Sequence, residues 1–78
     1  MQVEIISPDK KLFEGEASAI SLPGVDGSLG ILNNHAPLIS ALKKGTIKLT
    51  ENGNKSLEFQ VNGGVVEVFS NKVIILAE

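Results

Sequence analysis

Residues Leu22–Leu38, LPGVDGSLGILNNHAPL, interrupt an otherwise regular series of short apolar segments and decide where the chain must turn. This stretch holds the only histidine, two of the three prolines and three of the eight glycines, which recur every third residue at Gly24, Gly27 and Gly30. Glycine tolerates a positive φ and has no Cβ, so this spacing favours sharp turns and close backbone approach. The prolines near its two ends fix φ and remove amide donors. We therefore expect the stretch to form a corner of the fold and also to present a rigid loop to a partner.

Downstream of this stretch, apolar and polar residues alternate with the period of a half-buried β-strand. Residues 46–50 and 57–61 show the alternation most clearly, with one apolar face and one polar face on each segment. Between them, Glu51-Asn52-Gly53-Asn54 contains Asn-Gly, the strongest short-range signal for a tight hairpin. These residues predict a β-hairpin with one buried face and one solvent-exposed face.

Other segments extend the strand pattern along the chain. Between residues 12 and 22 the apolar positions change parity, which predicts a bulge or bend where the chain passes from one sheet to another. Lys43-Lys44-Gly45 is typical of a polar turn, and Gly63-Gly64 separates two further strand-like segments. Residues 73–76 are apolar on both faces, so this strand is expected to be central or covered by a neighbour. Eight to ten short strands with frequent turns predict an all-β antiparallel sandwich or flattened barrel.

Composition narrows the possible functions. The 78 residues suit one domain, residues 1–78, and the absence of cysteine excludes disulfides and thiolate metal sites. The net charge of −2, with no arginine, tryptophan or tyrosine, argues against a nucleic-acid partner. The apolar runs are too short to cross a membrane, and the first residues do not form a signal peptide. We therefore expect a cytoplasmic protein, or a peripheral component at a membrane.

No group of residues in the sequence predicts catalysis. His35 would need a nucleophile and an orienting carboxylate, and no serine lies in a nucleophile-elbow pattern, so packing or an interface role is favoured. The glycine series matches neither a dinucleotide-binding nor a phosphate-binding motif. Asp26-Gly27 lacks the further acidic ligands of a calcium loop. The sequence therefore indicates no catalytic, cofactor-binding or metal-binding residues and favours a binding or coupling module.

The order of motifs resembles a known family. The strings Leu22-Pro23-Gly24-x-x-Gly27-x-Leu29-Gly30-Ile31 and His35-Ala36-Pro37-Leu38 are similar to the N-terminal β-domain of the epsilon subunit of F-type ATP synthase. The likeness continues through Gly45, Gly63-Gly64 with Val66-Glu67-Val68, and Asn71 with Val73, Leu76 and Ala77. It covers nearly the whole chain, in order and without a large insertion.

The resemblance implies a fold and a place in a complex. The fold would be a ten-stranded antiparallel β-sandwich of two five-stranded sheets. The protein would be a non-catalytic rotor subunit of the central stalk that links the gamma subunit to the c-ring, and through gamma to the catalytic head of alpha and beta subunits. It would couple proton or sodium-ion translocation to ATP synthesis, as a peripheral protein on the cytoplasmic face of the bacterial inner membrane. The C-terminal helical hairpin of longer members would be absent.

The resemblance also assigns contact residues. Ser7, His35, Ala36 and Ser40 match positions that face gamma. Asp26, Gly27 and Ser28 match the loop that reaches the c-ring.

The residues alone leave two other functions open. A carrier domain resembling lipoyl or biotinyl domains would have Lys55 at a hairpin tip, although residues 51–55 do not supply the carrier motif. Intact mass distinguishes it, because a carrier gains a lipoyl or biotinyl increment. A small hydrolase would depend on His35, and its esterase activity would disappear in His35→Ala.

Overall fold

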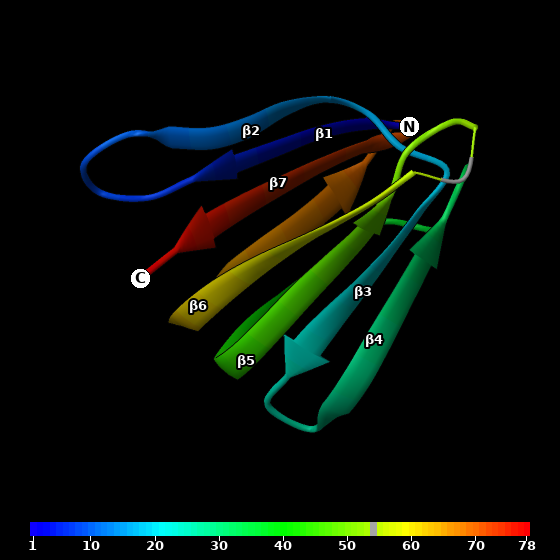
Figure 1. Ribbon diagram of the computed structural model, residues 1–78. Helices are drawn as coiled ribbons and strands as arrows, with labels where there is room; N and C mark the ends of the chain where they lie inside the picture. Colours follow the sequence, from blue (N-terminus) through cyan, green and yellow to red (C-terminus); the bar gives the residue numbers. More distant parts are fainter. Residues whose placement is uncertain (54) are drawn as a thin grey trace.

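Seven β-strands form one continuous sheet in the computed structural model, which describes residues 1–53 and 55–78. The strands are β1 (Gln2–Ile6), β2 (Lys11–Glu16), β3 (Ala19–Gly24), β4 (Gly27–Leu32), β5 (Leu38–Thr50), β6 (Ser56–Phe69) and β7 (Lys72–Ala77). Their order across the sheet is β2-β1-β7-β6-β5-β3-β4 (Figure 1). β1 and β7 pair in parallel, and the other neighbouring strands pair antiparallel.

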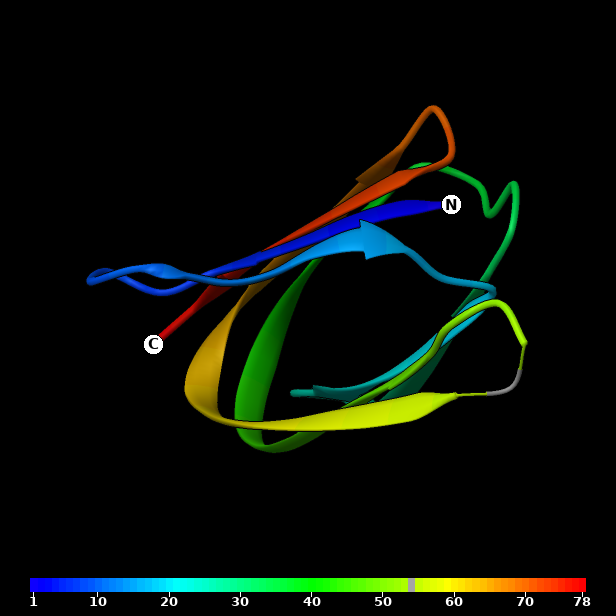
Figure 2. The same ribbon diagram turned by 45° about the horizontal axis from the view of Figure 1, so that its top comes forward.

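The sheet folds over itself into two layers because its two longest strands bend (Figure 2). β5 has 13 residues and β6 has 14, and their register holds from the Leu38–Val68 pair to the Thr50–Ser56 pair. The first layer contains β1, β2 and β7 with the beginning of β5 and the end of β6. The second layer contains β3 and β4 with the remaining parts of β5 and β6. The sandwich is therefore one hydrogen-bonded sheet that continues around a bend.

Glycines permit this bend and the close approach of β3. Gly63 and Gly64 have φ of 145° and 143°, a region that side-chain-bearing residues rarely adopt. A Cβ on Gly64 would collide with the backbone carbonyl oxygen of Leu76. A Cβ on Gly45 would lie 2.8 Å from the Cβ of Pro23 in β3. The glycines therefore remove side chains where two strands need the space.

The predicted strand count and sheet division are wrong, although the all-β sandwich is confirmed. Lys43-Lys44-Gly45 lies inside β5, and Gly63-Gly64 lies inside β6. At these positions the chain bends without releasing its cross-strand pairing, so segments predicted as separate strands are parts of longer ones. The parallel pairing of β1 with β7 also corrects the prediction of a purely antiparallel fold.

The turn and bend predictions were more successful. The parity change between residues 12 and 22 marks Ala17 and Ser18, where the chain leaves β2 in the first layer and enters β3 in the second. The predicted hairpin joins β5 to β6 through Asn52 and Gly53, whose φ is 89°. Asn54, the fourth residue of that predicted turn, lies outside the described residues.

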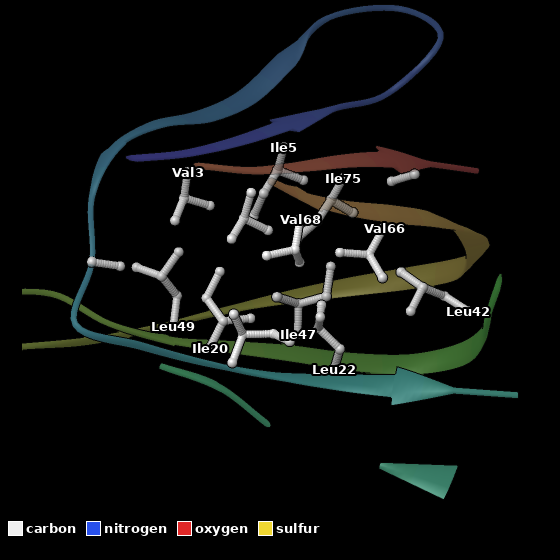
Figure 3. Close-up of a cluster of buried hydrophobic side chains, with 14 of the residues drawn as sticks. Val3, Ile5, Ile20, Leu22, Leu42, Ile47, Leu49, Val66, Val68 and Ile75 are labelled. Carbon is white, nitrogen blue, oxygen red and sulfur yellow. The ribbon is translucent and has the colours of Figure 1, made fainter. Parts of the chain in front are cut away.

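The core lies between the two layers (Figure 3). Its largest fully buried side chains are Val3, Ile5, Leu22, Ile31, Ile47, Leu49, Val66, Val73 and Ile75. Those that Figure 3 labels point into the space between the layers. Phe13 of β2 contacts Phe59 of β6 at a ring-centroid distance of 5.9 Å, which adds an aromatic contact beside this cluster. Among the described residues, no polar or charged residue is buried in this core. Such dense packing leaves the body little freedom to deform.

Candidate functional site

The outer faces of the two layers differ in polarity. The second layer presents polar side chains outward, including Ser21, Thr46, Lys48, Glu58 and Gln60. The first layer presents an apolar surface, which we call the docking face: Ile6, Ile39, Ala41, Val65, Phe69, Ile74 and Leu76. Ile39 is 71% exposed and Leu76 is 54% exposed. Most of the exposed large apolar side chains therefore lie on the docking face, whereas the second layer and its β3–β4 hairpin expose Leu32 and Val25.

The strand register makes the docking face continuous. One row crosses four neighbouring strands through Ala41, Val65, Leu76 and Ile6. The next outward row passes from Ile39 of β5 to Ile74 of β7. Directly paired side chains on one sheet face are neighbours, so these residues form a patch. Contiguous exposed apolar patches mark surfaces that bind another molecule.

The docking face contains a hollow over the β5–β6 pair. Its volume is about 380 Å³, and it is bordered by Pro37, Leu38, Ile39, Glu67, Val68 and Phe69. Five of these six residues are apolar, and Glu67 supplies the one charged side chain in this lining. The hollow suits a protruding apolar side chain from a partner.

An ion-paired cluster borders the docking face on β1 and β2. Glu4 and Glu14 are direct cross-strand partners, and such facing like charges destabilise a sheet unless a cation lies between them. Lys11 Nζ lies 3.0 Å from Glu4 Oε2 and 3.0 Å from Glu14 Oε1. The hydrogen bond to Glu4, followed by the one to Glu14, raises the pKa of Lys11 above 10.5. The cluster therefore keeps this flank of the face polar.

The structure places two of the predicted gamma-facing residues at opposite ends of the first layer. Ser7 follows β1, where its amide donates to Lys10 O at 2.8 Å and its hydroxyl donates to the same oxygen at 2.9 Å. His35 lies near the other end of β1, and Asn71 provides the connection. Its side-chain Oδ1 accepts from the amide of Asn34, the residue before His35, and its carbonyl oxygen accepts from the amide of Gln2, where β1 begins. The length of β1 separates them by roughly 17 Å. They do not form one cluster, but they flank the docking face.

His35 is held in a turn. Its Nδ1 lies 2.8 Å from the carbonyl oxygen of Ala36, so Nδ1 carries the proton and donates it in that hydrogen bond. Its amide donates to Leu32 O at 3.2 Å. In the described part of the chain, no serine hydroxyl or carboxylate forms a hydrogen bond with the ring. The nucleophile and orienting acid that a hydrolase requires are therefore not assembled around His35 in the described chain.

Ser40 and Ala36, the other predicted gamma-facing residues, differ in exposure. Ala36 is exposed in the segment that leads into β5. Ser40 is half-buried and pairs with Val66, which belongs to the inward-facing row. Ser40 therefore lies on the opposite face of β5 from Ile39 and Ala41. Because of this pairing, the side chain of Ser40 is not part of the docking face.

The predicted c-ring residues form one exposed group. Asp26, Gly27 and Ser28 lie at the tip of the β3–β4 hairpin, and Gly27 has a φ of 129°. The preceding residue, Val25, donates its amide to Ala41 O at 3.1 Å, which ties the tip to β5. The hairpin tip is thus an anchored loop on a different part of the surface from the hollow.

Three other features bear on function: a lysine for a carrier domain, a metal site and a membrane-spanning helix. Lys55 is exposed in the β5–β6 turn, where its carbonyl oxygen accepts from Glu51 N at 2.7 Å. The described chain brings no three histidine or acidic side chains together as a possible metal site. No helix of the length and apolar character needed to cross a membrane occurs in the described residues.

Sequence reasoning missed most of the docking face, although one signal pointed to it. Residues 73–76 were recognised as apolar on both faces, and the predicted central position of that strand is confirmed by β7 between β1 and β6. The outward side chain of Leu76 nevertheless remains 54% exposed. Nothing in the described residues covers that face, so the two-sided apolar pattern marks it as a candidate docking surface.

Comparison with known proteins provides a family assignment. Residues 1–78 match the sequence profile of the ATP synthase delta/epsilon chain β-sandwich domain. The chain is 48% identical over 77 residues to an ATP synthase epsilon chain of Dichelobacter nodosus, covering 99% of this chain and 54% of that relative. It is 40% identical to an epsilon chain of Chlorobium limicola, covering 99% of this chain and 88% of that relative. The chain thus spans about half the length of the first relative and most of the second.

Solved structures share the fold. A chain in the Tetrahymena thermophila mitochondrial ATP synthase central stalk/c-ring structure is 28% identical, with a TM-score of 0.82 over 99% of this chain and 62% of that chain. A chain in the Euglena gracilis mitochondrial ATP synthase structure gives a TM-score of 0.90 at 22% identity, over 96% of this chain and 48% of that chain. The two-layer arrangement is therefore found in assembled ATP synthases.

Proposed function

The chain belongs to the ATP synthase delta/epsilon chain β-sandwich family, and from this premise we propose that it is the epsilon-type, non-catalytic rotor module of a central stalk. It links the gamma subunit to the c-ring and couples proton or sodium-ion translocation to ATP synthesis in the alpha and beta subunits. It is peripheral at the cytoplasmic face of a bacterial membrane. The bond-making steps belong to other subunits of the complex.

The docking face is the observation that carries this proposal. A stable protein–protein interface buries about 1,200–2,000 Å² in total. The apolar patch spans four neighbouring strands, so it can provide the centre of such an interface. We assign gamma to this face, with Ser7 at one end and His35 and Ala36 at the other. Ser40 contributes from the beginning of β5, where no residue of β3 pairs with it, rather than from the face itself.

The hairpin tip at Asp26, Gly27 and Ser28 provides a second, separate contact. It is exposed, and it lies where the sheet bends rather than over the hollow. We assign the c-ring contact to this tip. Because the two surfaces are distinct, gamma and the c-ring can be bound at the same time, which a linking subunit requires.

The continuous sheet suits the transmission of torque. β5 and β6 keep one register from the first layer to the second, with only the opposed residues Lys44 and Asn62 unpaired at the bend, so the two contact surfaces belong to one hydrogen-bonded network. A densely packed core between the layers resists shear. Force applied at one surface therefore reaches the other without an intervening flexible linker.

Co-purification tests the proposed function. The affinity-tagged chain, expressed in its own organism, should recover gamma together with alpha and beta subunits. Ser28→Cys carrying a thiol-attached photo-cross-linker should cross-link to a c subunit in assembled complexes, whereas Glu58→Cys on the polar outer face, labelled in the same way, should not. Recovery of neither gamma nor c subunits would contradict the proposal. A lipoyl or biotinyl mass increment would support the carrier function instead.

A further inference from the structure

Glu67 lies at the centre of the docking face. In the outward row of the first layer it sits between Ile39 on β5 and Ile74 on β7. Val65 and Phe69, two residues before and after it, project from the same face of β6. Its side chain also borders the hollow of about 380 Å³. One carboxylate is thus surrounded by the apolar groups that a partner would cover.

This carboxylate has no partner in the described chain. The ion pairs there join Lys11 to Glu4 and Glu14, and the N-terminal ammonium to Glu16, and none includes Glu67. Lys72 lies on the same outer face but is paired in register with Phe69 rather than with Glu67. Glu67 is exposed, so water solvates it while the face is free. A partner that covers the face removes this water.

Covering an unpaired carboxylate opposes binding, because a charge withdrawn from water requires a compensating charge or hydrogen bonds. We propose that Glu67 determines the specificity of the docking face by pairing with a lysine or arginine that the partner places over the hollow. The partner surface is therefore apolar with a basic residue at its centre. This inference rests on the proposed function and names the chemistry of the partner at that same site.

The charge distribution around the face agrees with such a partner. The outward rows of the first layer carry the carboxylates of Glu4, Glu14, Glu16 and Glu67 and the ammonium groups of Lys11, Lys43 and Lys72. Lys11 pairs with Glu4 and Glu14, and the N-terminal ammonium pairs with Glu16, so among these four carboxylates Glu67 is the one that no ion pair in the described residues includes. Complementary charge favours correct orientation, and like charge disfavours wrong partners. A basic residue of the partner opposite Glu67 is the arrangement that fits.

The test compares Glu67→Gln and Glu67→Lys with matched changes at Glu58. Glu58 lies on the same strand, is also exposed, and projects from the polar outer face of the second layer. Affinity for the purified gamma subunit of the same ATP synthase is measured by calorimetry. We expect Glu67→Gln to weaken binding about tenfold and Glu67→Lys by more than about a hundredfold, as for removal or reversal of one member of a covered charge pair. Glu58→Gln and Glu58→Lys should remain within about twofold of the unaltered chain.

Two further measurements separate the possible failures. Thermal unfolding of each variant shows that the sandwich is intact, since neither glutamate is buried. Changing the lysines and arginines of gamma one at a time to glutamate should yield one variant that restores binding to Glu67→Lys. If the unaltered chain binds gamma and Glu67→Gln binds equally well, the pairing is overturned while the proposed function stands. If the unaltered chain does not bind gamma, the proposed function itself fails.

Discussion

Ile39→Ala tests the docking face most directly, because it separates binding from folding. Ile39 is 71% exposed in the chain alone, so its truncation removes little buried apolar surface. A surface substitution of this kind changes the free energy of unfolding by about 0.5 kcal/mol or less. The exposed remainder of the side chain is the part that a partner would cover.

The expected loss of affinity follows from the same exposed fraction. Complete burial of an isoleucine side chain stabilises by about 1.5–3 kcal/mol. Since 71% of Ile39 is still available to be covered, truncation to alanine should weaken binding by about 1–2 kcal/mol. Because 1.4 kcal/mol is tenfold in an equilibrium constant, the dissociation constant for gamma should rise roughly 5- to 30-fold.

Leu32→Ala is the matched control for this substitution. Leu32 is 65% exposed and apolar, but it lies on β4 at the far edge of the sheet, away from the docking face. Titration calorimetry with gamma should show a change within about twofold for Leu32→Ala, and both variants should unfold at nearly the temperature of the unaltered chain. Equal losses of affinity for the two variants, or none for Ile39→Ala, would refute the assignment of this face.

Three further substitutions test the fold and the second surface. Gly45→Ala should destabilise the chain by roughly 1–3 kcal/mol in urea unfolding, because the new Cβ would lie 2.8 Å from Pro23, and a Pro23→Gly background should reduce that loss. Lys11→Gln should lower the melting temperature at pH 7 by leaving two facing glutamates unbridged. Since the pKa of Lys11 is raised, the stabilisation that its charge provides is complete below pH 10.5 and disappears as the pH rises through the folded-state pKa. A difference in melting temperature between Lys11→Gln and the unaltered chain that persists above that pKa would contradict this explanation. Gly30→Val should leave the isolated fold intact, because open space lies beside Gly30, but should weaken assembly of the complex; equal losses would make Gly30 only a corner residue.

The local features of the fold were predictable from the sequence. Asn52-Gly53 encodes its hairpin through glycine's tolerance of positive φ, and alternation in residues 46–50 and 57–61 encodes the buried face. The strand count was not predictable in the same way. Gly45 and Gly63-Gly64 have the composition of turns, yet cross-strand hydrogen bonds hold them within β5 and β6. Whether a glycine ends a strand or bends it depends on pairing partners that lie far away in the sequence.

The candidate site shows the same division between local and non-local information. The exposed tip at Asp26, Gly27 and Ser28 is one hairpin turn, so a short stretch of sequence suffices to locate it. The docking face instead requires β1 to lie in parallel beside β7, which brings Ile6 next to Leu76. Parallel pairing is not marked by any turn signal, because its strands are joined by a long connection. The resemblance supplied Ser7 and His35 at the ends of that face but not its centre.

β7 explains how one strand can serve both the core and an interface. Ile75 points inward and is fully buried, whereas the next residue, Leu76, points outward and is 54% exposed. Since successive side chains of a strand face opposite sides, stability and binding reside in alternate residues of the same segment. A strand with apolar residues at both sets of positions needs cover on both faces, and the described chain provides it on one. The hydrophobic pattern of β7 therefore favours a docking surface on its outer side, and we infer that Glu67 on the neighbouring strand restricts which partner binds there.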